Sequence, residues 1–270
     1  MQLIIPAFNE QNRLPATLKS LRAYALSTSG LPNPPLEVLV VDNGSTDRTA
    51  ELALAMSTPA MPVHVLHCAE PGKGAAVRAG IAATTADVVG FMDADGATEL
   101  SALAAASELL DAGADVVIGS RGLEESETEA RHHWLRHAGA AAYRKAAGRL
   151  VPGIVDTQCG FKILRGDLAR EVFATVATPG FAFDVELLAR CRRARARIDE
   201  LPVIWADVPG STFSPIRHGL RSFSDLVAIG WRLRREPVLE PVTTLRPAAG
   251  TPAAAATADE NVALRLVRSA

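Results

Sequence analysis

Two aspartates, Asp93 and Asp95, stand one residue apart at the end of an apolar run in the stretch FMDADGAT. Carboxylate oxygens are hard ligands that suit Mg²⁺ or Mn²⁺, and two carboxylates this close repel each other unless a cation is present. A bound divalent ion can bridge to a diphosphate and neutralise charge on a departing group. Taken alone, however, an Asp-x-Asp pair is commonly a solvated loop, so the metal hypothesis depends on what surrounds it.

Short apolar runs typical of buried strands recur through residues 2–134, and one of them leads into the two aspartates. The runs are QLIIPA, LEVLVVD, PVHVLHC, ADVVGFMD and ADVVIGS, separated by amphipathic stretches rich in Ala and Leu. Strands that are apolar on both faces and alternate with helices indicate a parallel sheet covered by helices. We therefore predict an α/β fold with a Rossmann-like, mostly parallel sheet.

Helical patterns dominate the second half of the chain, at residues 131–149, 166–175 and 184–197. The stretch PGIVDTQCGFKIL breaks the first pattern with a Pro and a Gly. A strand is predicted at DELPVIWADV, followed by a basic amphipathic helix over residues 214–235. Beyond that helix the composition shifts to Ala, Pro and Thr, which predicts a flexible tail over residues 236–270.

Polar residues gather after the first four predicted strands. Ligands of an open parallel sheet bind beyond the carboxyl ends of its strands, so these residues would meet in one crevice. They are Pro6, Phe8, Asn9 and Glu10 after the first strand, Asp42, Gly44, Ser45 and Asp47 after the second, Glu70 to Gly74 after the third, and Asp93 and Asp95 after the fourth.

Each of these groups has a use if the ligand is a nucleoside diphosphate. Asp42 can accept hydrogen bonds from a base or ribose, and Phe8 offers a ring for stacking. Gly72-Lys73-Gly74 supplies backbone freedom and a cation where a helix begins, which favours phosphate. Each signal is weak alone, since Asp-Asn-Gly is more often a turn and Gly-Lys-Gly lacks the full phosphate-loop spacing. Their joint placement on successive strand ends favours the nucleotide site.

Composition excludes several classes of protein. The 270 residues are 48% hydrophobic and 21% charged, with a net charge of −2, so nothing indicates a nucleic-acid binder. Cys68, Cys159 and Cys191 are far apart, which argues against a disulfide framework or zinc cage and fits a reducing compartment. No signal peptide is recognised, and no run approaches the roughly 20 apolar residues of a membrane span. We expect a cytoplasmic protein.

Five motifs, IIPAFNE, VVDNGSTDRT, PGKGAAVRAGI, FMDADGAT and GSR, resemble in order and spacing the nucleotide-sugar domain of family 2 glycosyltransferases, which have the GT-A fold. DTQCGFKIL, FAFDVELL and WADVPGSTFSP are most similar to the dolichyl-phosphate β-glucosyltransferases and their bacterial polyprenyl-phosphate relatives within that family. The resemblance implies an inverting, metal-dependent transfer of glucose from UDP-glucose to a polyprenyl phosphate. It also implies one GT-A domain over residues 1–235, with a nucleotide-sugar half (1–120) and an acceptor half (121–235).

The resemblance further implies roles for the matching residues. On the donor side, the residues that would hold the uridine or its phosphates are Pro6, Phe8, Glu10, Asp42, Gly72, Lys73, Arg78 and Asp93. The ligands of Mg²⁺ or Mn²⁺ would be Asp93 and Asp95, with Asp95 the more direct. The catalytic group would be Asp184, Glu186 and Arg121, and the sugar and acceptor side would be lined by Arg131, Gln158 and Lys162.

Two residues depart from the family pattern. Phe8 replaces a Tyr common in relatives, and Ala97 stands where lipid-phosphate mannosyltransferases often carry a metal-binding Gln, which argues against mannose transfer.

The acceptor decides whether the reaction needs a base. A phosphate acceptor is already anionic and needs no strong base. Asp184 would then orient the acceptor, or act as base if the acceptor is a hydroxyl compound. The alternatives are therefore GDP-mannose, a soluble hydroxyl acceptor, or a non-catalytic nucleotide-sugar-binding protein.

The segment SPIRHGLRSFSDLVAIGWRLRR combines apolar residues at helical spacing with arginines. Leu220, Phe223, Leu226, Val227 and Trp231 would lie together on such a helix. A basic amphipathic helix suits a membrane interface, but its apolar stripe can equally pack on the domain core. Because the resemblance implies a lipid acceptor, we expect peripheral contact with the inner face of the membrane.

Overall fold

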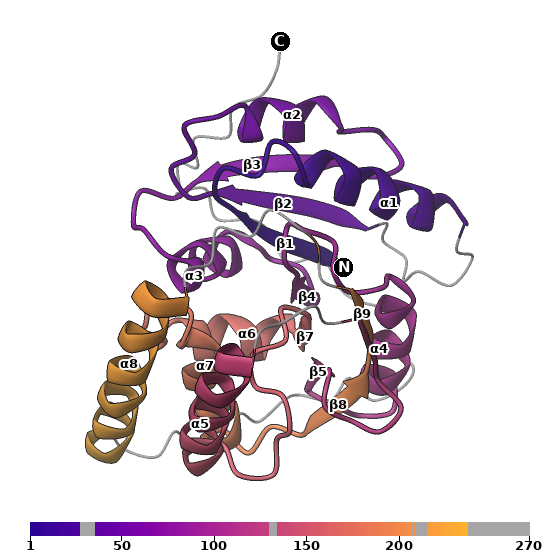
Figure 1. The fold of residues 1–270 in the computed structure, drawn as a ribbon. Coiled ribbons are helices and arrows are strands. Elements are labelled where there is room, and N and C mark those ends of the chain that lie inside the picture. Colours follow the sequence, from indigo (N-terminus) through magenta and orange to yellow (C-terminus); the bar gives the residue numbers. More distant parts are fainter. Residues whose placement is uncertain (28–35, 130–133, 207, 209–214, 237–270) are drawn as a thin grey trace.

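The structure, a computed structural model, describes residues 1–27, 36–129, 134–206, 208 and 215–236. Across these residues one sheet of seven strands runs in the order β3-β2-β1-β4-β7-β5-β8 (Figure 1). The strands are β1 (Gln2–Ala7), β2 (Glu37–Asp42), β3 (Val63–His67), β4 (Val88–Phe91), β5 (Val116–Ser120), β7 (Lys162–Arg165) and β8 (Ile198–Pro202). The five strands predicted from the first half of the sequence are confirmed.

The sheet is mostly parallel, as predicted, with one exception. Strands β1, β2, β3 and β4 pair in parallel, as do β5 and β8. Strand β7 lies antiparallel between β4 and β5, and its residue Lys162 is in register with Phe91 on one side and Ile118 on the other. Sequence analysis missed this strand, which carries a lysine into the middle of the sheet.

Helices cover both faces of the sheet, because each strand points alternate apolar side chains to opposite sides. Ile4 belongs to a core that also contains Val77, Phe183 and Ile229, whereas Leu3 and Ile5 belong to the core on the other face. The helices of the first core are α3 (Lys73–Ala83), α5 (Trp134–Leu150), α6 (Gly166–Phe173), α7 (Phe183–Arg193) and α8 (Pro215–Arg235). Those of the second are α1 (Leu14–Ser27), α2 (Thr49–Ala55) and α4 (Ser101–Asp111).

The stretch DELPVIWADV (residues 199–208), predicted as one strand, contributes to two. After β8 the chain passes through Val203 into β9 (Ile204–Ala206), which pairs in parallel with β6 (Glu127–Glu129). The segment after Asp95 joins β9 through two backbone hydrogen bonds, Glu99 N–H to Ile204 O at 3.0 Å and Ala206 N–H to Ala97 O at 3.0 Å. The second half of the chain therefore supports the loop that carries the two aspartates.

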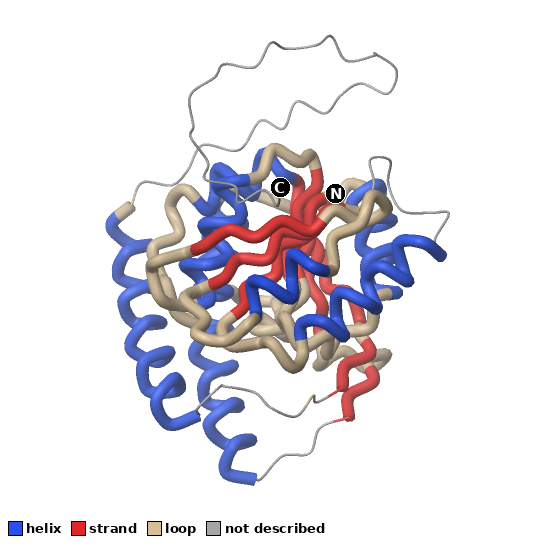
Figure 2. Tube along the Cα trace, turned by 90° about the horizontal axis from the view of Figure 1, so that it is seen from above, coloured by secondary structure: helices blue, strands red, loops and turns tan. Residues whose placement is uncertain are grey.

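Helices α5 and α8 contact each other along one side of the molecule, as both views show (Figures 1 and 2). The predicted helices of the second half are confirmed with slightly different ends. Strands β7 and β8 come from residues 121–235 yet complete the same sheet as β1–β5, so the two halves share one sheet. The tail prediction falls on residues outside the described ones, except Glu236, which is ion-paired with Arg190.

Candidate active site

Asp93 lies just beyond the carboxyl end of β4, facing the first residue of α3. Its Oδ1 is 2.5 Å from Nζ of Lys73. Burial by itself raises the pKa of Asp93, but the positive charges of Lys73, Lys162 and Arg121 together hold this pKa below its usual value. A Cβ atom on Gly160 would lie 2.0 Å from the Asp93 carboxylate, so a larger residue at position 160 would push this carboxylate out of its present position.

Asp95 points to the other side of the same loop. Its Oδ1 accepts a hydrogen bond from the Ala97 N–H at 3.2 Å, and its Oδ2 is 3.6 Å from Nη1 of Arg13. Burial and the charge of Asp93 raise the pKa of Asp95. The loop thus carries two partly buried carboxylates whose mutual repulsion a cation would relieve.

Arg13 also holds Glu10, a predicted uridine ligand. Its guanidinium donates from Nε to Glu10 Oε2 at 2.7 Å and from Nη2 to Oε1. Both carboxylate oxygens of Glu10 therefore have a cationic partner, and a direct contact with uridine would compete with that pair. Sequence analysis missed Arg13, which lies three residues after Glu10 in the turn just before α1.

The donor set of Asp93 and Asp95 fits Mg²⁺ or Mn²⁺, because both supply hard oxygen atoms. Among the described residues, no group of three or more His, Cys, Asp and Glu side chains gathers as a metal cage. A divalent ion here would therefore take its remaining ligands from the bound diphosphate and water. Ala97, where a Gln ligand was considered, is buried and its carbonyl is bonded to β9.

A side-chain contact between Asp42 and His67 links the carboxyl ends of β2 and β3. Asp42 is buried, with Oδ2 at 3.0 Å from Nδ1 of His67, while Phe8 is 48% exposed and open to a stacking partner. The Asn43 side chain donates to Glu70 O at 2.6 Å and accepts from the Gly72 N–H at 2.7 Å. Asn43 therefore fixes the loop of residues 70–72 that leads into α3, a role that sequence analysis did not assign.

Gly72 itself needs to be glycine for two reasons. Its φ of 129° is unfavourable for other residues, and a Cβ there would lie 2.2 Å from Pro179 O. Pro6, half-buried in β1, pairs with Val41 of β2. Pro6 and Asp42 lie at the carboxyl ends of β1 and β2, and Phe8, Gly72, Lys73 and Asp93 come after β1, β3 and β4. These sequence-predicted donor residues therefore lie at the carboxyl ends of four adjacent strands.

Lys162 and Asp184 form a fully buried ion pair. Nζ of Lys162 donates to Asp184 Oδ1 at 2.6 Å and to Cys159 O at 2.7 Å, and it lies 5.4 Å from the centre of the Phe91 ring. Burial raises the pKa of Asp184 although Lys162 and Lys73 oppose that rise. The family resemblance assigned Asp184 to the catalytic group and Lys162 to the sugar and acceptor side, but the pairing of the two was not predicted.

Arg121, just after β5, is held by Asp156. Its Nε donates to Asp156 Oδ2 at 2.7 Å and its Nη2 to Oδ1 at 3.1 Å. Such a two-point contact fixes the plane of the guanidinium group, which also lies 5.4 Å from the Trp205 ring centre. Asp156, part of the DTQCGFK motif, was not singled out from the sequence. Gln158 donates to Phe181 O at 3.4 Å and so joins this motif to the start of α7.

Comparison with known proteins identifies the family of this chain. The family model described as Glycosyl transferase family 2 matches residues 2–173. The chain belongs to glycosyltransferase family 2. The dolichyl-phosphate beta-glucosyltransferase of Drosophila melanogaster is 35% identical to it over 85% of this chain and 74% of the relative, and that of Homo sapiens is 30% identical over 87% and 78%. The predicted family and enzyme class are confirmed.

Solved structures agree with the predicted GT-A fold. This glycosyltransferase superimposes on glucosyl-3-phosphoglycerate synthase from Mycobacterium tuberculosis, solved with Mn²⁺, UDP and glucosyl-3-phosphoglycerate, with a TM-score of 0.61. The two chains are 20% identical, and the match covers 87% of this chain and 80% of the other. At that identity the likeness concerns the fold, which is confirmed.

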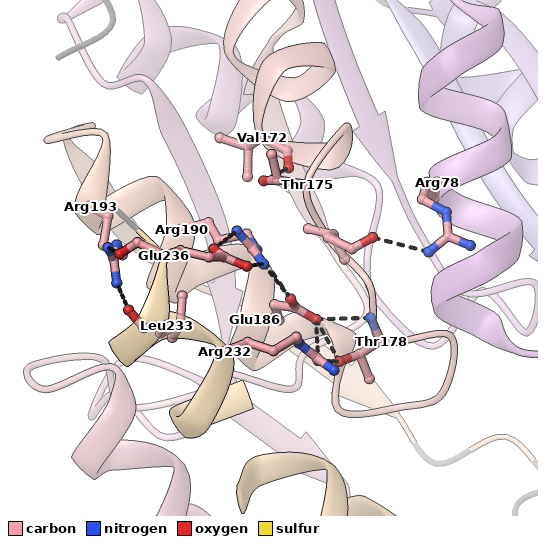
Figure 3. A network of polar contacts seen from close by, with 11 residues as sticks. Arg78, Val172, Thr175, Thr178, Glu186, Arg190, Arg193, Arg232, Leu233 and Glu236 are labelled. Atoms are coloured by element: carbon pink, nitrogen blue, oxygen red, sulfur yellow. Dashed lines mark hydrogen bonds and ion pairs between the residues drawn. The ribbon is translucent and has the colours of Figure 1, made fainter. Parts of the chain in front are cut away.

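Two predicted site residues of the glycosyltransferase, Glu186 and Arg78, are bonded to other groups of the protein. Both carboxylate oxygens of Glu186, assigned above to the catalytic group, are bonded to Thr178, Arg190 and Arg232 (Figure 3). Arg78, predicted near the uridine or its phosphates, instead donates to Val176 O at 3.0 Å and pairs with Glu70. Either side chain would have to give up these partners to contact a substrate, and the sequence analysis did not predict the partners. Arg131 lies outside the described residues.

Proposed function

We propose that this enzyme transfers glucose from UDP-glucose to the phosphate of a polyprenyl lipid, with a divalent metal ion bound by Asp93 and Asp95. The observation that carries the donor side is the placement of Asp93 against Lys73 just beyond the carboxyl end of β4, with Asp95 two residues further on. Relatives named dolichyl-phosphate beta-glucosyltransferase, which match most of the chain, support the proposed acceptor. Neighbours solved with UDP and Mn²⁺ or Mg²⁺ support the nucleotide and metal classes.

The residues of the site then divide the work. Phe8 would stack on the uracil ring, Asp42 would accept from the base or ribose, and Lys73 would shift from Asp93 to the diphosphate. When bound, the metal ion would neutralise negative charge on the departing UDP. Arg121, with 32% of its side chain exposed, would present its fixed positive charge to a phosphate.

The state of Asp184 favours a phosphate acceptor over a hydroxyl acceptor. A base for a hydroxyl must reach the proton it removes, but only 3% of the Asp184 side chain is exposed and it is paired with Lys162. A phosphate oxygen is anionic near neutral pH and can attack the anomeric carbon from the face opposite UDP without such a base. Asp184 would then position Lys162 and the motif around Cys159, and need not accept a proton.

The test is reconstitution of the purified protein with Mn²⁺, UDP-glucose and a polyprenyl phosphate. We expect a glucosylated lipid whose formation releases UDP. A thermal-shift panel of UDP-, GDP- and dTDP-sugars identifies the donor independently, since a ligand that binds only the folded state raises the melting temperature. If GDP-mannose or a soluble hydroxyl compound reacts and the stated pair does not, the proposal is wrong.

Helix α8 supports contact between the enzyme and a membrane surface. Among the side chains described on it, Leu226 and Ile229 are buried on the core, so one stripe packs inward. A second apolar stripe stays exposed, with Phe223, Val227 and Trp231 at 37%, 75% and 54%. Arginines flank the exposed stripe at positions 221, 234 and 235. One face of α8 therefore packs on the domain core, as one interpretation of the sequence predicted. The opposite, exposed face combines apolar side chains with arginines, which suits contact with anionic headgroups. Within the described ranges, no helix is long and apolar enough to span a bilayer.

The double variant Val227→Ser/Trp231→Ala should bind anionic vesicles at least about tenfold more weakly, because each lost side chain removes buried apolar area worth about 1.5–3 kcal/mol. Cosedimentation with vesicles containing phosphatidylglycerol measures this. Transfer to a short, water-soluble acceptor should be unchanged. Leu26→Ser, which removes a 69% exposed apolar side chain from α1, is the matched control. Equal vesicle binding by the double variant and the control would contradict the membrane role of α8.

A further inference from the structure

Glu186 is a fully buried carboxylate surrounded by donors from three parts of the chain (Figure 3). Its Oε2 accepts from the Thr178 N–H at 2.9 Å, the Thr178 hydroxyl at 2.5 Å and Arg232 Nη2 at 3.0 Å. Its Oε1 accepts from Arg190 Nη2 at 2.8 Å and Nε at 3.1 Å. Burial alone raises the pKa of Glu186, but these donors hold it below its usual value, so the group is a carboxylate in the folded protein.

One side of this network holds the C-terminal half of α8. Arg232, on α8, donates both to Glu186 and to the Thr178 hydroxyl, the latter at 2.6 Å. Arg190, on α7, bonds Glu236 just after α8 at 2.6 and 3.0 Å. Charge-assisted hydrogen bonds of this kind are stronger than neutral ones, and buried networks fix a single arrangement. The position of α8 is therefore tied to α7 and to Thr178.

The other side of the network contacts the start of α3, where Gly72, Lys73 and Gly74 lie. The segment that contains Thr178 and Pro179 lies against the first turn of α3, where Ala75 N–H donates to Pro179 O at 3.2 Å. A Cβ on Gly72 would be 2.2 Å from Pro179 O, and one on Gly74 would be 2.5 Å from Thr178 O. Lys73 lies between these two glycines. Because the backbone of Thr178 and Pro179 packs directly against Gly72 and Gly74, we expect a shift of the Thr178 segment to move the backbone that carries Lys73.

We propose that Thr178, Glu186 and Arg232 are positioning residues that couple the seating of α8 to the placement of Lys73 at the donor site. This inference rests on the proposed function, in which Lys73 meets the donor diphosphate and α8 meets the membrane. The coupling runs through contiguous contacts: Arg232 to Thr178 and Glu186, Pro179 to Gly72 and Ala75, and Lys73 to Asp93. An enzyme seated on a membrane through α8 would thus hold its donor site in the binding arrangement.

The test compares Arg232→Gln with Arg234→Gln. Both remove one positive charge from the same turns of α8, but Arg234 is exposed. Two quantities are measured in detergent-free buffer: the hydrogen exchange rates of the Ala75 and Ala76 amides in the ligand-free protein, and the Kd for UDP with Mn²⁺. Arg232→Gln should raise both by at least about fivefold, the lower end of typical coupling between sites, and Arg234→Gln should change neither. Arg232→Lys keeps the charge with fewer donors and should give an intermediate effect.

Thr178→Val provides a milder second variant, since it removes the hydroxyl that Arg232 and Glu186 share and keeps the shape and the backbone N–H. It should raise the same exchange rates in the same direction. If Arg232→Gln and Thr178→Val lower the melting temperature yet leave exchange and Kd at control values, the network only packs α8 and the inference is wrong. If the unaltered protein binds no UDP, the proposed donor fails, while the exchange rates still decide whether the coupling exists.

Discussion

Asp95→Asn should lower the turnover of glucose transfer by about a hundredfold to a thousandfold, the range seen when one preorganised electrostatic contact to a transition state is lost. The substitution keeps the size of the side chain and removes one of the two carboxylates on the β4 loop. Its charge is the one least balanced by partners, since the nearest cation, Arg13, is 3.6 Å away and shared with Glu10. The measurement is kcat at saturating UDP-glucose across a Mn²⁺ titration.

Stability should move the other way in this variant. Burial and the Asp93 charge raise the pKa of Asp95 and so already disfavour its ionised form. Removing that charge should therefore leave the melting temperature of the metal-free protein unchanged or higher. Asp111→Asn, at an exposed aspartate of α4, is the control for a lost negative charge. Chelation of divalent ions with EDTA should reproduce the loss of turnover in the unaltered enzyme. Full turnover of Asp95→Asn would exclude a metal-assisted transfer through this pair.

The donor side of the site was predictable because it follows a rule of local sequence. Each of the four strands β1–β4 is a short apolar run, and polar residues after such a run must lie at the same edge of a parallel sheet. Asp42, Lys73 and Asp93 could therefore be placed together before any geometry was known. What the rule does not give is which oxygens are already bonded, and for Glu10 that information came only with Arg13.

The acceptor side was less predictable because its elements depend on contacts between distant residues. Strand β7 is four residues long and includes Lys162, a residue type that strand patterns reject at a buried position. The lysine is tolerated because Asp184, twenty-two residues later, neutralises it. The partners of Glu186 were missed for a related reason: its motif suggested substrate contact, whereas Thr178 and Arg232 are brought to it only by folding.

Lys162→Met should destabilise the folded protein by about 3–5 kcal/mol at pH 7, because removal of one partner leaves a buried charge uncompensated. Methionine has a similar length and no charge, so the change concerns the ion pair more than the packing. Nζ of Lys162 lies 2.6 Å from Asp184 Oδ1, and the two side chains are only 0% and 3% exposed to solvent. The free energy of unfolding by urea measures the loss, and Lys145→Met, at an exposed lysine of α5, is the control.

The pH dependence distinguishes this charge effect from a simple packing defect. Burial already raises the pKa of Asp184 in the folded protein, and loss of Lys162 raises it further. Between the unfolded pKa and that raised value, the folded state binds more protons than the unfolded one, so stability falls as pH rises. The deficit of Lys162→Met should therefore be smallest at acidic pH and grow towards neutral and mildly alkaline pH. Adding Asp184→Asn should remove most of the deficit and its pH dependence, whereas a deficit that is equal at acidic and alkaline pH would show that Asp184 carries no buried charge.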